Sequence, residues 1–83
     1  MTEDDALALV RNALATAVPH RAMDLQNAAQ KASLHDLELD SIATLEVIGL
    51  VEDALGGIEI PDEQLGTIRS VQHLINIVME HKS

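Results

Sequence analysis

Apolar residues recur every three or four positions near the start of the chain, which is the pattern of an amphipathic helix. Thr2 followed by Asp5 resembles a capping box, with Asp in place of the usual Glu or Gln, and Pro19 cannot continue a helix. The pattern therefore predicts a first helix from about Glu3 to Val18. Its inward stripe consists of Ala6, Leu7, Val10, Ala13, Leu14 and Ala17.

Residues 19–37 show a much weaker pattern, because polar residues interrupt the apolar ones. We expect a long loop with local turns here, and we expect Leu34 and Leu37 to anchor its end in the core. Loops longer than about 12–15 residues are unusual in compact domains. Such a loop is therefore either functional or wrongly assigned.

A second strong helical pattern follows Asp40, which is a good N-cap residue. It predicts a helix from Ser41 to about Leu55, ended by Gly56-Gly57. At 100° per residue, one arc of this helix faces the core and contains Ala43, Thr44, Val47, Ile48, Leu50, Val51, Ala54 and Leu55. The opposite arc contains Ile42, Leu45, Glu46, Gly49, Glu52 and Asp53.

The second arc combines two aliphatic residues with carboxylates, which favours docking of a partner with basic residues. Burial of Ile42 and Leu45 inside this chain explains the same pattern equally well. Gly49 costs roughly 0.5–1 kcal/mol relative to Ala in a helix interior. Its position on this arc either permits close approach of a partner or has no function.

The rest of the chain predicts two further helices. Residues 58–61 form an extended loop, and a short helix follows Pro61 and is limited by Gly66. Ser70 caps a last helix that ends near His81. Its inward residues are Val71, Leu74, Ile75, Val78 and Met79. The predicted fold class is all-α.

The composition of the chain narrows the classes of partner and chemistry that are compatible with it. Residues 1–83 make a single domain, and its core must be aliphatic because Phe, Tyr and Trp are absent. The net charge of −9 argues against nucleic acid and anionic membranes as partners. Without cysteine there is no disulfide or metal thiolate. The acidic N-terminus is unlike a signal peptide and no apolar run has membrane-spanning length, so we expect a cytoplasmic protein.

Ser41 is the candidate for chemistry. A hydroxyl at a helix N-terminus lies beside unpaired N–H groups and the positive end of the macrodipole, which suit a phosphate. The sequence around Ser41 lacks the Gly-x-Ser-x-Gly elbow of serine hydrolases. The histidines lack metal-ligand spacing and are expected at the surface. We therefore interpret Ser41 as an acceptor of modification by another protein, with no catalytic or metal-binding residues in this chain.

Four motifs then lie in a fixed order: Asp40-Ser41-Ile42, Leu45-Glu46-Val47, Ile58-Glu59-Ile60-Pro61-Asp62-Glu63 and Ser70-Val71. Their order and spacing resemble acyl carrier proteins. That family has an Asp-Ser-Leu signature, an acidic second helix, an Ile-Pro loop and a Thr/Ser-Val start to its last helix. The three-residue signature alone is weak. The whole set, spread over residues 37–78 of an acidic chain of family-typical length, is specific.

The resemblance implies a four-helix bundle with three longer helices, one short helix and a long loop between the first and second helices. It implies that a phosphopantetheinyl transferase attaches 4′-phosphopantetheine from coenzyme A to Ser41, and that the arm carries acyl groups as thioesters. Asp40 matches the aspartate that supports this modification through the transferase's magnesium. Basic surfaces of the transferase and of acyltransferases, ketosynthases or ligases would meet the second arc, which is the predicted partner-binding set: Ile42, Leu45, Glu46, Gly49, Glu52 and Asp53.

Some residues depart from the family pattern. Glu38 stands where the family often has Gly, Ile42 replaces Leu, and Gly49 falls where a larger apolar contact residue is common. The Gly56-Gly57 loop is one residue longer than in typical fatty-acid carriers. A polyketide, aminoacyl, peptidyl or other secondary-metabolite carrier is therefore nearly as well supported as a fatty-acid carrier.

Chain ends close to the first and last helices favour a free-standing carrier. We also expect it to be a monomer. The competing hypotheses are a carrier-like structural or regulatory subunit that is never modified, and a small enzyme that uses Ser41 and a histidine.

Overall fold

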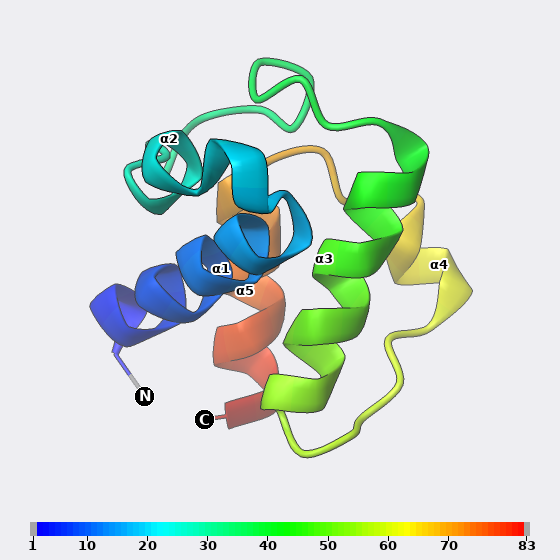
Figure 1. Ribbon diagram of the computed structural model, residues 1–83. Coiled ribbons are helices and arrows are strands. Elements are labelled where there is room, and N and C mark those ends of the chain that lie inside the picture. The colour runs from blue at the N-terminus through cyan, green and yellow to red at the C-terminus, as the bar shows by residue number, and fades with distance from the viewer. Residues whose placement is uncertain (1, 83) are drawn as a thin grey trace.

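The computed structural model describes the backbone of residues 2–82 and the side chains of residues 2–81. Helix α1 spans Glu3–Ala17 and begins with the predicted capping box. Thr2 Oγ1 accepts the Asp5 N–H at 3.2 Å, and Asp5 Oδ2 accepts the Thr2 N–H. Helix α1 contacts α2, α3 and α5 (Figure 1). The first helix is thus confirmed, and α2, α3 and α5 all pack against it.

The prediction of a long loop at residues 19–37 is wrong in part. A 3-10 turn, η1 (Pro19–Arg21), leads directly into a short helix, α2 (Ala22–Gln26). Leu25 is fully buried, and Arg11 Nε on α1 donates to the Ala28 carbonyl at 2.9 Å. Packing on α1 therefore stabilises a helix too short to be stable alone, which is why the sequence pattern does not reveal it.

Helix α3 spans Ser41–Ala54, as predicted to within one residue. Gly56 and Gly57 have φ values of 93° and 82°, which the chain requires to leave the helix. The core face of α3 is confirmed for Val47, Ile48, Val51 and Leu55, all of which are buried. Ala54 is a correction, because it lies exposed at the edge of the α1–α3 contact.

The C-terminal part follows the prediction closely. Helix α4 spans Asp62–Leu65 and α5 spans Val71–Lys82. Ser70 Oγ accepts the His73 N–H at 3.2 Å, which confirms Ser70 as the cap of α5. The inward residues Val71, Leu74, Ile75 and Val78 are at most 1% exposed, whereas Met79 is partly buried.

Backbone hydrogen bonds hold the segment between α2 and α3 against the start of α5. The Leu34 N–H donates to the Arg69 carbonyl at 2.9 Å, and the Val71 N–H donates to the Ala32 carbonyl at 3.0 Å. Leu34 is buried and Leu37 packs against the core, as expected. In Figure 1 this segment crosses one end of the bundle and leads into the first turn of α3. These bonds to the residues at the start of α5 therefore fix the path of the chain that leads to Ser41.

The observed architecture confirms the all-α class and the aliphatic core. It adds one short helix, α2, to the three longer helices and one short helix expected. Among residues 2–82, no helix is both long and apolar enough to cross a membrane.

Candidate functional site

Ser41 is the first residue of α3, and its side chain is exposed. Asp40 precedes it as the N-cap: its Oδ1 accepts the Ala43 N–H at 2.7 Å, and its carbonyl accepts the Thr44 N–H at 2.9 Å. The carboxylate of Asp40 thus satisfies the Ala43 N–H, one of the unpaired donors in the first turn of α3. The N–H groups of Ser41 and Ile42 lie before the first intrahelical bond and face the positive end of the macrodipole.

The turn before Ser41 is tightly held. Glu38 has φ 58°, in the left-handed region that glycine adopts without strain. The Glu38 N–H donates to the His35 carbonyl at 2.9 Å, and Arg21 Nη1 donates to the Leu37 carbonyl at 2.6 Å. The left-handed backbone at Glu38 gives a physical reason for the glycine that acyl carrier proteins often have there.

The outward arc of α3 is exposed as the docking hypothesis requires. Ile42 is 71% exposed and Leu45 is 60% exposed, so burial inside this chain does not explain them. Glu46 and Asp53 are also exposed. A Cβ atom added at Gly49 would meet no atom within 4 Å. These residues form one continuous surface beside Ser41.

Glu52 differs from the other acidic residues of the arc. It is only partly exposed, and its Oε2 accepts the Ile60 N–H at 2.7 Å. Because Ile60 is 2% exposed, this bond satisfies a backbone donor in a buried residue. Glu52 therefore ties the loop at residues 58–61 to α3, a role that the sequence did not suggest.

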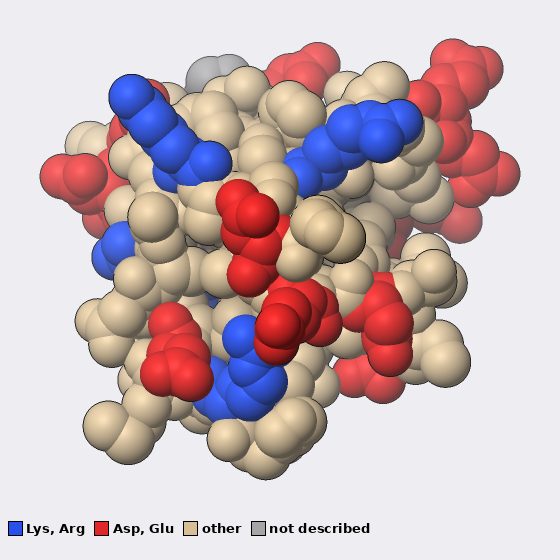
Figure 2. All heavy atoms as spheres, turned by 90° about the horizontal axis from the view of Figure 1, so that it is seen from above, with Lys and Arg blue, Asp and Glu red and all other residues tan. Residues whose placement is uncertain are grey.

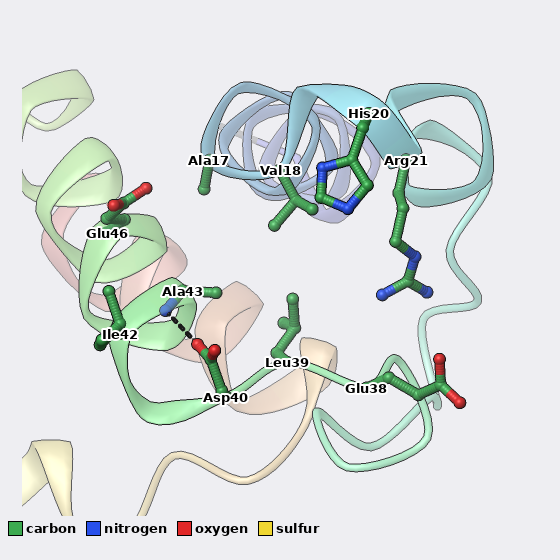
Figure 3. Close-up of a pocket in the computed structure, with 10 residues that line it drawn as sticks. All are labelled: Ala17, Val18, His20, Arg21, Glu38, Leu39, Asp40, Ile42, Ala43 and Glu46. Atoms are coloured by element: carbon green, nitrogen blue, oxygen red, sulfur yellow. Dashed lines mark hydrogen bonds between the residues drawn. The ribbon is translucent and has the colours of Figure 1, made fainter.

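A hollow of about 430 Å³ adjoins the first turn of α3 on its α1 side. In Figure 3, Val18 and Leu39 point toward each other across the hollow, and Ala17 comes from α1 while Glu46 comes from α3. His20 and Arg21 come from η1 on the α1 side. The remaining lining residues are Glu38, Asp40, Ile42 and Ala43. The sequence did not indicate this hollow.

The charges are unevenly spread. Figure 2 shows the end of the molecule that carries the α2–α3 connection: acidic side chains predominate toward the side of α3 and α4, whereas basic side chains lie among acidic ones elsewhere. Within the described part of the chain, no group of three His, Cys, Asp or Glu side chains is arranged to hold a metal ion. His20, His35, His73 and His81 are all exposed, as expected.

Comparisons with known proteins define the class of this domain. A family model described as "Phosphopantetheine attachment site" matches residues 8–78. The acyl carrier protein of Thermobifida fusca (strain YX) is 35% identical over 51 residues, which are 61% of this chain and 63% of that protein. The acyl carrier protein of Rickettsia bellii (strain OSU 85-389) is 38% identical over 48 residues, 58% of either chain.

A further relative, the acyl carrier protein of Rubrobacter xylanophilus, is 42% identical over 48 residues, again 58% of either chain. The chain thus spans less than two thirds of the length of these curated relatives. No solved structure matches it significantly. Since the family model covers most of the chain, the chain belongs to the acyl carrier protein family, in which 4′-phosphopantetheine is the covalent cofactor.

Proposed function

We propose that Ser41 Oγ is the attachment point of the phosphopantetheine arm, and that the chain carries acyl intermediates as thioesters on it. The observation that supports this most is the exposure of Ser41 at the first residue of α3, directly after its Asp40 cap. A phosphate bound there lies beside the first-turn N–H groups, which favour an anion. No side chain of the described residues covers the hydroxyl with a hydrogen bond, so an enzyme can reach it.

The attachment is a phosphoryl transfer from coenzyme A. Ser41 Oγ bonds to the phosphorus next to the pantetheine, the bond to the 3′,5′-ADP portion breaks, and the Oγ proton is lost. The terminal thiol that the arm brings can then form a thioester. This chain contributes position and recognition, whereas the transferase and the acyl-handling enzymes supply the catalysis.

The outward arc of α3 is the proposed recognition surface. Ile42 and Leu45 offer apolar area next to Ser41, and Glu46 and Asp53 offer exposed charge to basic enzyme surfaces. Gly49 lies between them and has no side chain, so the space beside it on the helix surface stays open. Glu52 also contributes negative charge to this surface from α3, although its carboxylate is already hydrogen-bonded to the Ile60 N–H of the following loop.

Several classes of cargo are compatible with a phosphopantetheine carrier. Fatty-acid, polyketide and other secondary-metabolite synthesis all use such carriers, as do aminoacyl and peptidyl assembly. Glu38, Ile42, Gly49 and the two-glycine exit from α3 depart from typical fatty-acid carriers, so a specialised carrier is nearly as well supported as a fatty-acid carrier. Intact mass of the protein from its native host identifies the group on the arm.

Modification of the purified apo-protein tests the proposal. With coenzyme A and a broad-specificity phosphopantetheinyl transferase, the wild-type chain should gain the mass of one phosphopantetheine group, and Ser41→Ala should gain none. Ser33→Ala is the matched control, because Ser33 is a partly buried serine in the preceding loop, and it should gain the same mass as wild type. An unmodified wild type, or a modified Ser41→Ala, contradicts the proposal.

The two competing classes give different results. A carrier-like subunit that is never modified keeps its function in Ser41→Ala. An enzyme that uses Ser41 as a nucleophile is labelled by a serine-directed phosphonate.

A further inference from the structure

The peptide unit between Leu37 and Glu38 is held from both sides. Its carbonyl accepts a hydrogen bond from Arg21 Nη1 at 2.6 Å, and its N–H donates to the His35 carbonyl at 2.9 Å. Figure 3 shows the Arg21 side chain extending from η1 toward the segment that carries Glu38. Because Glu38 precedes Ser41 by three residues, the orientation of this peptide unit sets the direction in which the chain enters α3.

Glu38 holds a conformation that it would leave if this peptide unit were free to turn. Its φ of 58° is left-handed, which is unfavourable for a residue with a Cβ atom. Rotation of the peptide plane changes ψ of Leu37 and φ of Glu38 together, and it can return Glu38 to the negative φ that residues other than glycine prefer. The same rotation turns the Leu37 carbonyl away from Arg21. The Arg21 bond therefore opposes the relaxation of a strained turn.

The bond from Arg21 Nη1 to the Leu37 carbonyl, here called the Arg21 clamp, is the tie from η1 to this turn. The backbone bonds within the turn are local: Leu37 donates to Ser33 at 3.2 Å and Leu39 donates to Leu34 at 3.2 Å. The Arg21 clamp is shorter, carries a charged donor and lies partly buried, which makes it stronger than a neutral backbone bond in water. Loss of Arg21 therefore frees the turn on its η1 side.

A relaxed turn changes where Ser41 Oγ lies relative to the rest of α3. Leu39 and Asp40 follow the turn directly, and the Asp40 cap on the Ala43 N–H depends on the direction from which they arrive. Displacement of a reacting atom by about 1 Å costs up to about a hundredfold in rate. Because the outward arc of α3 stays in place, this loss falls on kcat rather than on binding.

We propose that Arg21 is a positioning residue for the modification of Ser41: the Arg21 clamp holds Glu38 in its left-handed conformation and thereby fixes the position of Ser41 Oγ for phosphoryl transfer. The proposal rests on the proposed attachment at Ser41. It assigns a role in the reaction to η1, which lies outside α3 and outside every motif of the sequence. Arg21 acts through the backbone and needs no contact with the transferred group.

Removal of the clamp tests the proposal. Arg11→Ala is the matched control for Arg21→Ala, because Arg11 Nε donates to the Ala28 carbonyl at 2.9 Å and so ties the other end of the same connection to α1. In transferase assays well below the Tm of each variant, Arg21→Ala should lower kcat at least about tenfold, or about 1.4 kcal/mol, and change KM less than about twofold. Arg11→Ala should keep the wild-type kcat. Equal kcat values for the two variants overturn the proposal.

Two substitutions at position 38 separate strain from charge. Glu38→Gly removes the strain, because glycine adopts positive φ readily, whereas Glu38→Gln removes the same charge and keeps the strain. Since coupled residues are not additive, Arg21→Ala should lower kcat about tenfold in the Glu38→Gln background and less than about threefold in the Glu38→Gly background. Equal losses in the two backgrounds assign the effect of Arg21 to something other than the strained turn and overturn the proposal.

NMR of the unmodified chain tests the clamp without the transferase. The couplings and NOEs that report φ at Glu38 should show a positive angle in wild type and in Arg11→Ala, and a negative or averaged angle in Arg21→Ala. A positive angle retained in Arg21→Ala overturns the clamp and leaves the attachment at Ser41 standing. A wild-type chain that the transferase never modifies overturns the attachment, and the positioning role with it.

Discussion

Asp40 combines a structural role with a proposed functional one, and two substitutions separate them. Its Oδ1 accepts the Ala43 N–H at 2.7 Å and caps α3, and its charge lies directly before Ser41. Asp40→Ala removes both the cap and the charge. Asp40→Asn removes the charge but keeps a side-chain oxygen, and Asn and Asp are about equally good N-caps.

The cap sets the expected loss of stability. Replacing an Asp N-cap with Ala typically costs about 1 kcal/mol, and in a domain of this size 1 kcal/mol lowers Tm by about 4–8 °C. We expect this shift for Asp40→Ala. Asp40→Asn loses only the attraction between the carboxylate and the helix dipole, about 0.3–1 kcal/mol at low ionic strength, and salt screens this attraction. At physiological salt its Tm should therefore fall by less than that of Asp40→Ala.

Far-UV circular dichroism measures both Tm values, since a chain without Phe, Tyr or Trp offers no fluorescence signal. The transferase kcat/KM, measured well below either Tm, then reports on the charge. We expect both variants to be modified more slowly than wild type, and by similar factors. An unchanged Tm in Asp40→Ala would refute the capping argument, and a wild-type rate in Asp40→Asn would refute the role of the charge.

Three further variants address the loop and the arc around α3. Glu46→Lys combined with Asp53→Lys should weaken binding to the transferase with no loss of helix content, and raising salt should weaken wild-type binding; unchanged affinity by calorimetry would contradict the docking assignment. Glu38→Gly should raise the free energy of unfolding by about 0.5–1 kcal/mol, because relief of about 1–2 kcal/mol of left-handed strain exceeds the entropic cost of glycine; a lower urea midpoint would contradict this. Glu52→Ala should lower the free energy of unfolding by about 1–3 kcal/mol by leaving the buried Ile60 N–H unpaired, whereas exposed Asp53→Ala should change it by less than about 0.5 kcal/mol; equal urea midpoints would show that the Glu52 bond contributes nothing.

The elements that could be predicted from the sequence are those whose causes are local. The boundaries of α1 and α3 follow from Thr2, Asp40 and the Gly56-Gly57 pair, and each of these acts through backbone groups within a few residues. Ser70 caps α5 in the same way. Helical periodicity placed Ile42 off the core face but left its burial or exposure open, and the structure shows it exposed.

The features that the sequence did not reveal depend on residues far apart in the chain. Helix α2 forms because Leu25 packs beneath α1 and Arg11 bonds the Ala28 carbonyl, 17 residues away. Glu52 turns from the docking arc to the Ile60 N–H, eight residues away across the exit from α3. Periodicity places a residue on a face of its own helix but does not show which loop or helix lies over that face.

Glu38 and Gly49 show where folding and function make different demands. A chain built only for stability would have glycine at position 38, where φ is 58°, and alanine at position 49, where a Cβ meets nothing within 4 Å. Each residue instead carries a local cost, and no contact within the described chain explains Gly49. Glu38 lines the hollow beside Ser41, and Gly49 lines a neighbouring hollow between α1 and α3. Their contribution is therefore expected in the complex with a partner, where Gly49 leaves room and Glu38 adds negative charge near Ser41.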